Sequence, residues 1–290
     1  MAQVSGAAKA CALGLDGGLT MSGNSLSSGP DCIMASNATG PAAISVNGSA
    51  QVVAYSLSTV GGCTGCSSAN VQLNKPYAEY QLPVSNPYQL LDSKSFPTSC
   101  LGSPPSQGTI LPTGLTHAYC QSISVPGQKT LDFSPGTYVF RNASFSTSGG
   151  SRITCSTCGA GTGLTMIFTG DPASIGTISI SGQAQVELRA PTTNTDDPDF
   201  DGVLFYRDAR AVSGTAVSIS GGSDSVISGA MYFPTSVQFS GNSGVQFSSC
   251  TALVAGSVDL TGSSATYVDV SGCDESSVRL PRVQIIRLAE

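Results

Sequence analysis

The sequence predicts an all-β fold, a right-handed parallel β-helix (β-solenoid) with coils of about 20 residues. Segments such as 237–247 alternate apolar with small or polar residues around a glycine. This period of two is typical of strands that bury one side. The pattern also recurs at a regular step, because Gly221, Gly241 and Gly262 are almost evenly spaced. Only 10% of the residues are charged, against about 25% in average globular proteins.

Residues 1–62 are expected to form the first coils. The segment 63–130 differs, because it is rich in proline and holds few alternating runs. We interpret 63–130 as a long irregular excursion that disulfides hold in place. It lacks a core pattern of its own, so residues 1–290 are expected to form a single β-solenoid domain.

Regular coils are expected from about residue 164 onward. The buried second strand of successive coils is predicted at four apolar runs: 164–168, 204–206, 231–233 and 253–254. From Gly182 to Gly221 the step nearly doubles. The spacing of the apolar runs favours one coil with an acidic loop insertion at 191–201 over an additional coil. The alternating segment 278–289 is expected to be a terminal strand that covers the last coil.

The ten cysteines are spaced like the coils. Taken in order as neighbouring pairs, they form three long intervals, each close to the coil step, and two Cys-x-x-Cys units. Residues one coil apart lie about 4.8 Å apart, within the roughly 4.4–6.8 Å that a disulfide bridges. The spacing therefore predicts three disulfides between coils and two within loops: Cys11–Cys32, Cys100–Cys120, Cys250–Cys273, Cys63–Cys66 and Cys155–Cys158.

Zinc and free thiols are the competing interpretations of these cysteines. The two Cys-x-x-Cys units supply four thiolates, which suit Zn²⁺. About 90 residues separate the two units, which is far outside zinc-ribbon spacing. The even count and the match to the coil step favour disulfides, and disulfides predict an oxidising compartment.

The acidic loop offers a candidate calcium site. Asp197, Asp199 and Asp201 precede Gly202 in an Asp-x-Asp-x-Asp-Gly pattern, and Asp208 falls at the twelfth position of such a loop. Carboxylates at this spacing are typical of calcium loops. The alternative is a solvated acidic loop that leads into a strand. No other cofactor is expected.

Composition argues against two classes of partner. The net charge is −6 and no basic run occurs, so nucleic acid is not an expected partner. No stretch approaches about 18 apolar residues, so no membrane span is expected within the chain. The first residues have neither a charged nor an apolar region of a signal peptide. We expect a targeting segment upstream of this chain.

The sequence does not predict an enzyme. Its acids and bases are scattered, whereas polysaccharide-degrading sites need clustered carboxylates or bases. The only histidine, His117, has no acid beside it. The alternatives are a carbohydrate-active β-helix enzyme and a carbohydrate-binding adhesin. A groove with three or more acids or arginines on adjacent coils would favour the enzyme.

Motifs along nearly the whole chain resemble a known family. They begin with Cys11-Ala-Leu-Gly-Leu-Asp16 and Leu19-Thr-Met-Ser-Gly-Asn24. Others lie at 44–50, 133–138, 163–170, 229–234, 237–242 and 278–290. In this order they resemble the C-terminal region of TadG-like proteins of the bacterial tight-adherence (Tad, or Flp) pilus assembly system.

This resemblance implies an upstream membrane anchor and a location outside the cytoplasm, in the periplasm or at the cell surface. The expected role is a non-enzymatic structural or interaction domain of a pilus assembly or adhesion component. Expected partners are pilus or cell-envelope proteins and surface glycans. The resemblance carries over no catalytic residues.

Overall fold

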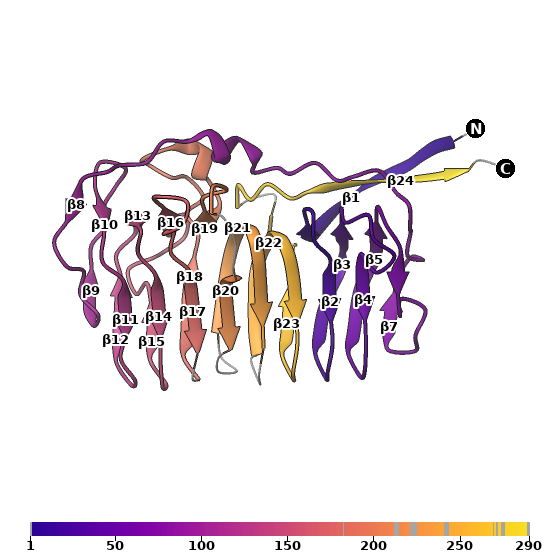
Figure 1. Cartoon of the computed structure of the whole chain (residues 1–290), viewed down its shortest axis with the longest axis horizontal. Helices are drawn as coiled ribbons and strands as arrows, with labels where there is room; N and C mark the ends of the chain where they lie inside the picture. Colours follow the sequence, from indigo (N-terminus) through magenta and orange to yellow (C-terminus); the bar gives the residue numbers. More distant parts are fainter. Residues whose placement is uncertain are drawn as a thin grey trace.

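The computed structural model describes residues 2–181, 183–211, 215–220, 225–240, 244–268, 270, 272–273 and 276–288. The chain is all-β, and its parallel strands stack side by side into an elongated body (Figure 1). The strands pair in three series, which we call the first, second and third faces. Gly182, Gly221 and Gly241 of the repeat lie outside the described residues.

The strands of the first face are given in their order of pairing, from one end of the rod to the other. They are β8 (Cys100–Leu101), β10 (Ala118–Tyr119), β13 (Gly136–Arg141), β16 (Leu164–Thr169), β19 (Val203–Arg207), β21 (Ser225–Phe239), β22 (Gly244–Leu260), β1 (Ala2–Gly14), β3 (Leu26–Ser36) and β5 (Gln51–Thr59).

The second face follows the same order. It contains β11 (Ile123–Val125), β14 (Phe145–Thr147), β17 (Ile178–Ser181), β20 (Thr215–Ser220), parts of β21 and β22, β2 (Leu19–Met21), β4 (Ile44–Val46) and β6 (Cys63–Thr64).

The third face shares its longest strands with the other two. It contains β9 (Gly108–Ile110), β12 (Thr130–Phe133), β15 (Arg152–Thr154), β18 (Gln185–Arg189), parts of β21 and β22, β23 (Ala265–Val268), parts of β3 and β5, and β7 (Val71–Leu73). Two 3₁₀ helices, η1 (Gln89–Ser93) and η2 (Pro198–Phe200), lie outside the strands.

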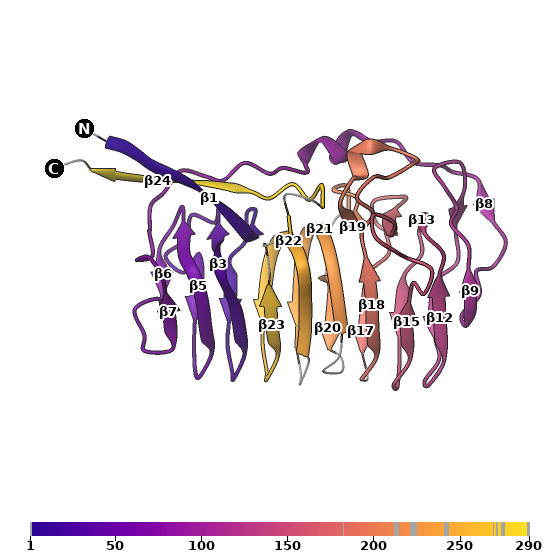
Figure 2. The same cartoon turned by 180° about the vertical axis from the view of Figure 1, so that it is seen from behind.

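The coils are not stacked in the order of the sequence. The chain enters in the middle of the rod at β1 and runs outward to β7 at one end (Figures 1 and 2). It then crosses to β8 at the opposite end and coils back until β22 and β23 pair with β1, β2 and β3. The first strand of the sequence therefore lies in the middle of the rod and not at one of its ends.

A ladder of glycines marks this junction. Gly262, Gly23 and Gly48 have φ values of +72°, +71° and +67°. A Cβ added to Gly23 would lie 2.9 Å from the carbonyl oxygen of Gly262, and one added to Gly48 would lie 3.3 Å from that of Gly23. Glycine adopts this backbone conformation without steric cost, so one turn shape continues from the C-terminal coil into the N-terminal coils.

The segment 63–130 contains short strands. Strands β6 and β7 lie near its start, and β8 to β11 lie in its second half. Its longest stretch between strands is residues 74–99, which we call the strap. The strap runs along the length of the rod and joins its two ends (Figure 1).

The last strand, β24 (Arg282–Leu288), does not cover the last coil as the sequence suggested. It pairs antiparallel with the first residues of β1, with Ala2 opposite Leu288 and Lys9 opposite Arg282. The last coil is covered instead by the N-terminal coils, which stack directly on it. This stacking gives the edge of the last coil its hydrogen-bonding partners.

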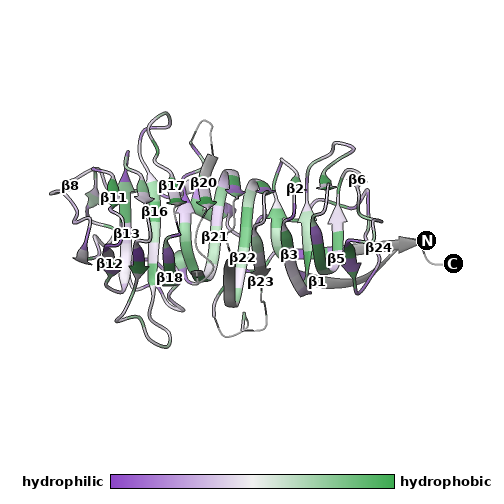
Figure 3. Ribbon diagram, turned by 90° about the horizontal axis from the view of Figure 1, so that it is seen from below, coloured by the Kyte–Doolittle hydropathy of each residue, from purple (hydrophilic) through white to green (hydrophobic). Residues whose placement is uncertain are grey.

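Apolar side chains from all three faces form the core. Hydrophobic residues recur in successive strands along the rod (Figure 3). Phe140 and Phe168, which are register partners, stack with ring centroids 4.9 Å apart. Every residue of β16 is buried, whereas β18 alternates exposed and buried positions. Strands buried on both sides read as continuous apolar runs, so the first face is covered on its outside at β16.

The structure pairs the ten cysteines as the sequence predicts, and no described cysteine is free. The Cα–Cα distances are 5.7 Å for Cys11–Cys32, 5.6 Å for Cys100–Cys120, 4.8 Å for Cys250–Cys273, 5.9 Å for Cys63–Cys66 and 5.3 Å for Cys155–Cys158. Ile167 pairs directly with Tyr206, which follows residues 191–201 in the sequence.

Candidate functional site

A groove of about 480 Å³ lies on the outer side of the third face. Its floor comes from three neighbouring strands, β12, β15 and β18, and it contains two acids and two arginines: Asp132, Arg152, Glu187 and Arg189. Thr130 and Thr154 add hydroxyl groups. The volume is within the range of small-molecule sites, roughly 300–1,000 Å³.

Strand register explains why these side chains meet. Thr130 pairs with Arg152, and Thr154 lies between Asp132 and Glu187. Alternate residues of a strand point to the same side, so these residues share the solvent side while Ile153 between them is buried. The groove therefore crosses the strands, along the direction in which the coils stack.

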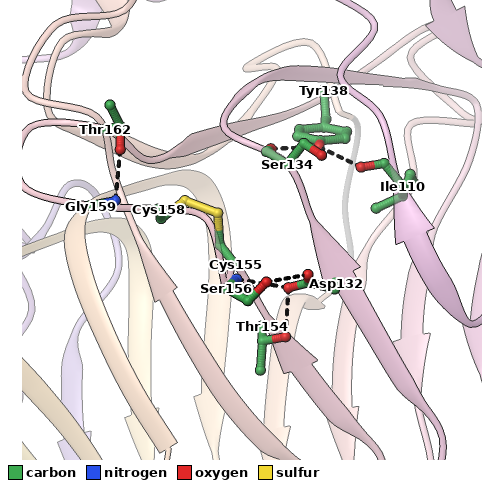
Figure 4. The surroundings of a disulfide bond; sticks show 10 residues. All are labelled: Ile110, Asp132, Ser134, Tyr138, Thr154, Cys155, Ser156, Cys158, Gly159 and Thr162. Atoms are coloured by element: carbon green, nitrogen blue, oxygen red, sulfur yellow. Dashed lines mark hydrogen bonds between the residues drawn. A yellow bond between two sulfur atoms is a disulfide. The ribbon is translucent and has the colours of Figure 1, made fainter.

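A disulfide loop forms one wall. Cys155, Ser156 and Cys158 line the groove. Figure 4 shows Asp132 pointing at the start of this loop. Its Oδ1 accepts hydrogen bonds from the Ser156 backbone N–H and the Thr154 hydroxyl, both at 2.8 Å, and the Ser156 hydroxyl donates to Oδ2. Asp132 thus fixes the position of the loop.

The hydrogen bonds also set the charge of Asp132. Burial raises the pKa of its carboxyl, but the donors from Ser156 and Thr154 outweigh burial and lower the pKa below its ordinary value. Asp132 is therefore ionised at neutral pH. A general acid for glycoside hydrolysis needs the opposite shift, so this residue is suited to holding the loop and not to donating a proton.

The other charges in the groove are exposed. Arg152 Nη2 lies 3.7 Å from Glu187 Oε2, with side chains 56% and 62% exposed. Such surface ion pairs are weak, about 0–1 kcal/mol. Within the described part of the chain, no carboxylate lies within ion-pair distance of Arg189. Arg189 also lines a second hollow of about 160 Å³ with Thr192 and Ser228, so it stands where two hollows adjoin.

The sequence alone did not single out this groove. The three strands of its floor are separated by unequal numbers of residues. The interval from Thr130 to its register partner Arg152 is shorter than the interval from Arg152 to its partner Gln185. A fixed coil step does not align these positions. The sequence does show charged residues in 152–154 and 185–189. Only the register of the strands reveals that these two segments lie side by side.

The predicted calcium residues have protein partners. Lys94 of the strap forms ion pairs with Asp197, at 2.7 Å, and with Asp199. Asp197 Oδ1 also accepts from the Asp199 backbone N–H at 3.0 Å, capping η2. Asp201 Oδ1 accepts from the Asn194 backbone N–H at 2.6 Å. The acidic loop therefore anchors the strap.

Asp208 lies apart from these contacts. Its side chain is only 2% exposed, and it accepts from Thr169 Oγ1 at 2.7 Å and from Arg210 Nε at 3.0 Å. Among the residues that the structure describes, no group of three or more His, Cys, Asp or Glu side chains is placed to hold a metal ion. The calcium site stays a prediction from the sequence.

His117 lies outside the groove. It is exposed, and its Nδ1 is 2.9 Å from the Thr116 hydroxyl.

No protein-family model, no curated protein and no solved structure matches this chain. Among the helical residues that the structure describes, none belongs to a helix long and apolar enough to cross a membrane.

Proposed function

We propose that this chain is a non-enzymatic structural and interaction domain of a bacterial tight-adherence (Tad, or Flp) pilus assembly or adhesion component. In this proposal it is a right-handed β-solenoid with coils of about 20 residues. It stands in the periplasm or at the cell surface, tethered by a membrane segment upstream. Its partners are pilus or cell-envelope proteins.

One observation carries the proposal: five cysteine pairs at disulfide distance brace a rod of parallel strands. Three of the pairs join segments about one coil apart in the sequence, and two close short Cys-x-x-Cys loops. Disulfides persist in oxidising compartments, which supports a location outside the cytoplasm. The resemblance of the motifs to TadG-like proteins supplies the pilus system.

The test is deletion of the coding region in the source organism. The expected result is fewer surface pili by electron microscopy and weaker adherence to glass, with both restored by a plasmid copy. A strain that keeps normal pili and adherence would contradict the proposal. Protection of the chain from protease in intact cells, but not in cells with a permeabilised outer membrane, would distinguish the periplasm from the surface.

A second candidate function is a carbohydrate-binding adhesin or a carbohydrate-active enzyme. The groove favours it, because two acids and two arginines lie on three neighbouring strands. The ionised state of Asp132 supports binding over acid catalysis.

A further inference from the structure

We infer that the groove between Asp132 and Arg189 binds an acidic oligosaccharide, with a sugar carboxylate on the Arg189 guanidinium. This inference deepens the second candidate function and rests on the groove alone, not on the pilus assignment. It identifies the class of ligand and the residue that selects it.

The charges of the groove select an anion. Asp132 directs its negative charge at Thr154 and Ser156. Arg152 and Glu187 offset each other across 3.7 Å. The cation that is left is Arg189, which is exposed and lines both hollows. A guanidinium presents a planar fork of donors that matches a carboxylate.

The remaining lining selects hydroxyl groups. The Thr130 hydroxyl can donate and accept hydrogen bonds, whereas the Thr154 and Ser156 hydroxyls donate to Asp132 and can accept from a ligand. The Glu187 carboxylate is 62% exposed and can accept hydrogen bonds from a ligand. A ligand with one carboxylate and several hydroxyls on each unit, such as a chain of uronic acids, satisfies both kinds of group.

The path of the groove suits an extended chain. It crosses β12, β15 and β18, so groups recur at the spacing of neighbouring strands, about 4.8 Å. Beyond Arg189 it meets the hollow with Thr192 and Ser228. Several sugar units can therefore lie along the rod.

A peptide fits this groove less well. Each of the three floor strands is paired on both sides, so no free strand edge is available for a peptide to pair with. The floor also presents no large apolar side chain to anchor a peptide, because the lining residues are charged, hydroxyl-bearing or disulfide-bonded.

Isothermal titration calorimetry on the oxidised chain tests the inference, with a galacturonic acid tetramer as the probe. We expect binding that weakens as salt is added, because salt screens exposed charges. Arg189→Gln should weaken binding about tenfold, since it removes a charge-assisted contact. Arg152→Gln provides a second variant in the groove and should weaken binding less. Arg282→Gln, which removes an exposed charge on β24 outside the groove, should leave binding unchanged.

Two comparison ligands make the result decisive. A galactose tetramer of the same linkage and a glutamate tetrapeptide should each bind at least about tenfold more weakly than the uronate. Equal binding of the galactose tetramer would overturn the role of Arg189 but leave the second candidate function standing. Equal binding of the tetrapeptide, or no binding of any sugar, would overturn the inference. Cleavage of the uronate would overturn the assignment as a binding site. None of these outcomes bears on the pilus deletion test.

Discussion

Leu13 and Val254 are direct register partners on neighbouring parallel strands, although they come from opposite ends of the sequence. Ala12 and Leu253 pair beside them, and Leu19 pairs with Val258 on the second face. The middle of the rod is therefore a junction between the beginning and the end of the described chain. The two halves also meet in the antiparallel ribbon of β1 and β24.

A circular permutant should fold faster than the natural chain. A short glycine-rich linker would join Leu288 to Ala2, which are register partners, and the chain would open after Leu82, which is 56% exposed. Sequence order then matches coil order, so Leu13 and Val254 come closer in sequence, and folding rates rise as contacts become local. Stopped-flow refolding with the disulfides intact measures this.

The matched control uses the same linker but opens the chain at Gly40, where nothing lies within 4 Å of an added Cβ. That cut moves the long-range pairing to β3 and β5 and leaves the strap within the chain, still joining the two ends of the rod. It should give no comparable acceleration. Equal refolding rates in the two permutants would contradict the explanation.

Loss of one hydroxyl should loosen the strap. Tyr206 donates to the Leu91 carbonyl oxygen at 3.0 Å, and both residues are buried. Tyr206→Phe removes this bond and leaves the carbonyl with only the Lys94 backbone N–H as a donor, which should cost about 0.5–1.5 kcal/mol. Trypsin should then cleave faster after Lys94, a strap residue whose side chain is 26% exposed. Tyr80→Phe is the control, because the Tyr80 side chain is 79% exposed, and it should leave the cleavage rate unchanged.

The disulfides should contribute unequally. Cys11–Cys32 closes a segment with a sequence separation of 21, and Cys63–Cys66 one of 3. By the chain-entropy model, removing the first pair with alanines should cost about 3 kcal/mol and removing the second about 2 kcal/mol. Thermal unfolding of the two double variants measures the difference. A larger loss for the short loop would count against the entropic explanation.

Acid should destabilise the fold partly through Asp208. Burial raises the pKa of this carboxyl, but hydrogen bonds and charge from Arg210 and a hydrogen bond from Thr169 outweigh burial and lower it. A lowered folded-state pKa stabilises the protein above the unfolded pKa, roughly 4, and that contribution is lost as pH falls through the folded value.

Asp208→Asn should therefore reduce stability at pH 7, and its difference from the natural chain should shrink below about pH 4. Urea unfolding at a series of pH values measures this. Asp16→Asn, at an exposed position, serves as the control. A constant difference for Asp208→Asn across the pH range would show that the carboxylate charge is not responsible.

The sequence predicted what depends on local pattern. Alternation identified strands such as β22, a continuous apolar run identified β16, and the cysteine step identified pairs such as Cys11–Cys32. The order of the coils was beyond its reach, because any coil with this apolar and glycine pattern offers the same stacking surface. Gly23 accepts Gly262 as its neighbour as readily as it accepts Gly48. The groove was missed because the three strands of its floor are separated by unequal numbers of residues, so a fixed coil length does not align them.

The central junction also bears on the timing of synthesis. The N-terminal coils leave the ribosome first, yet the strand that completes their open side, β22, is made only after most of the remaining chain. Until then β1 and β2 present an unpaired edge, which is a template for pairing with another chain. Synthesis therefore passes through a long interval in which this edge is open to pairing with another chain. The same interval offers a natural point for one copy to exchange its last coils with another.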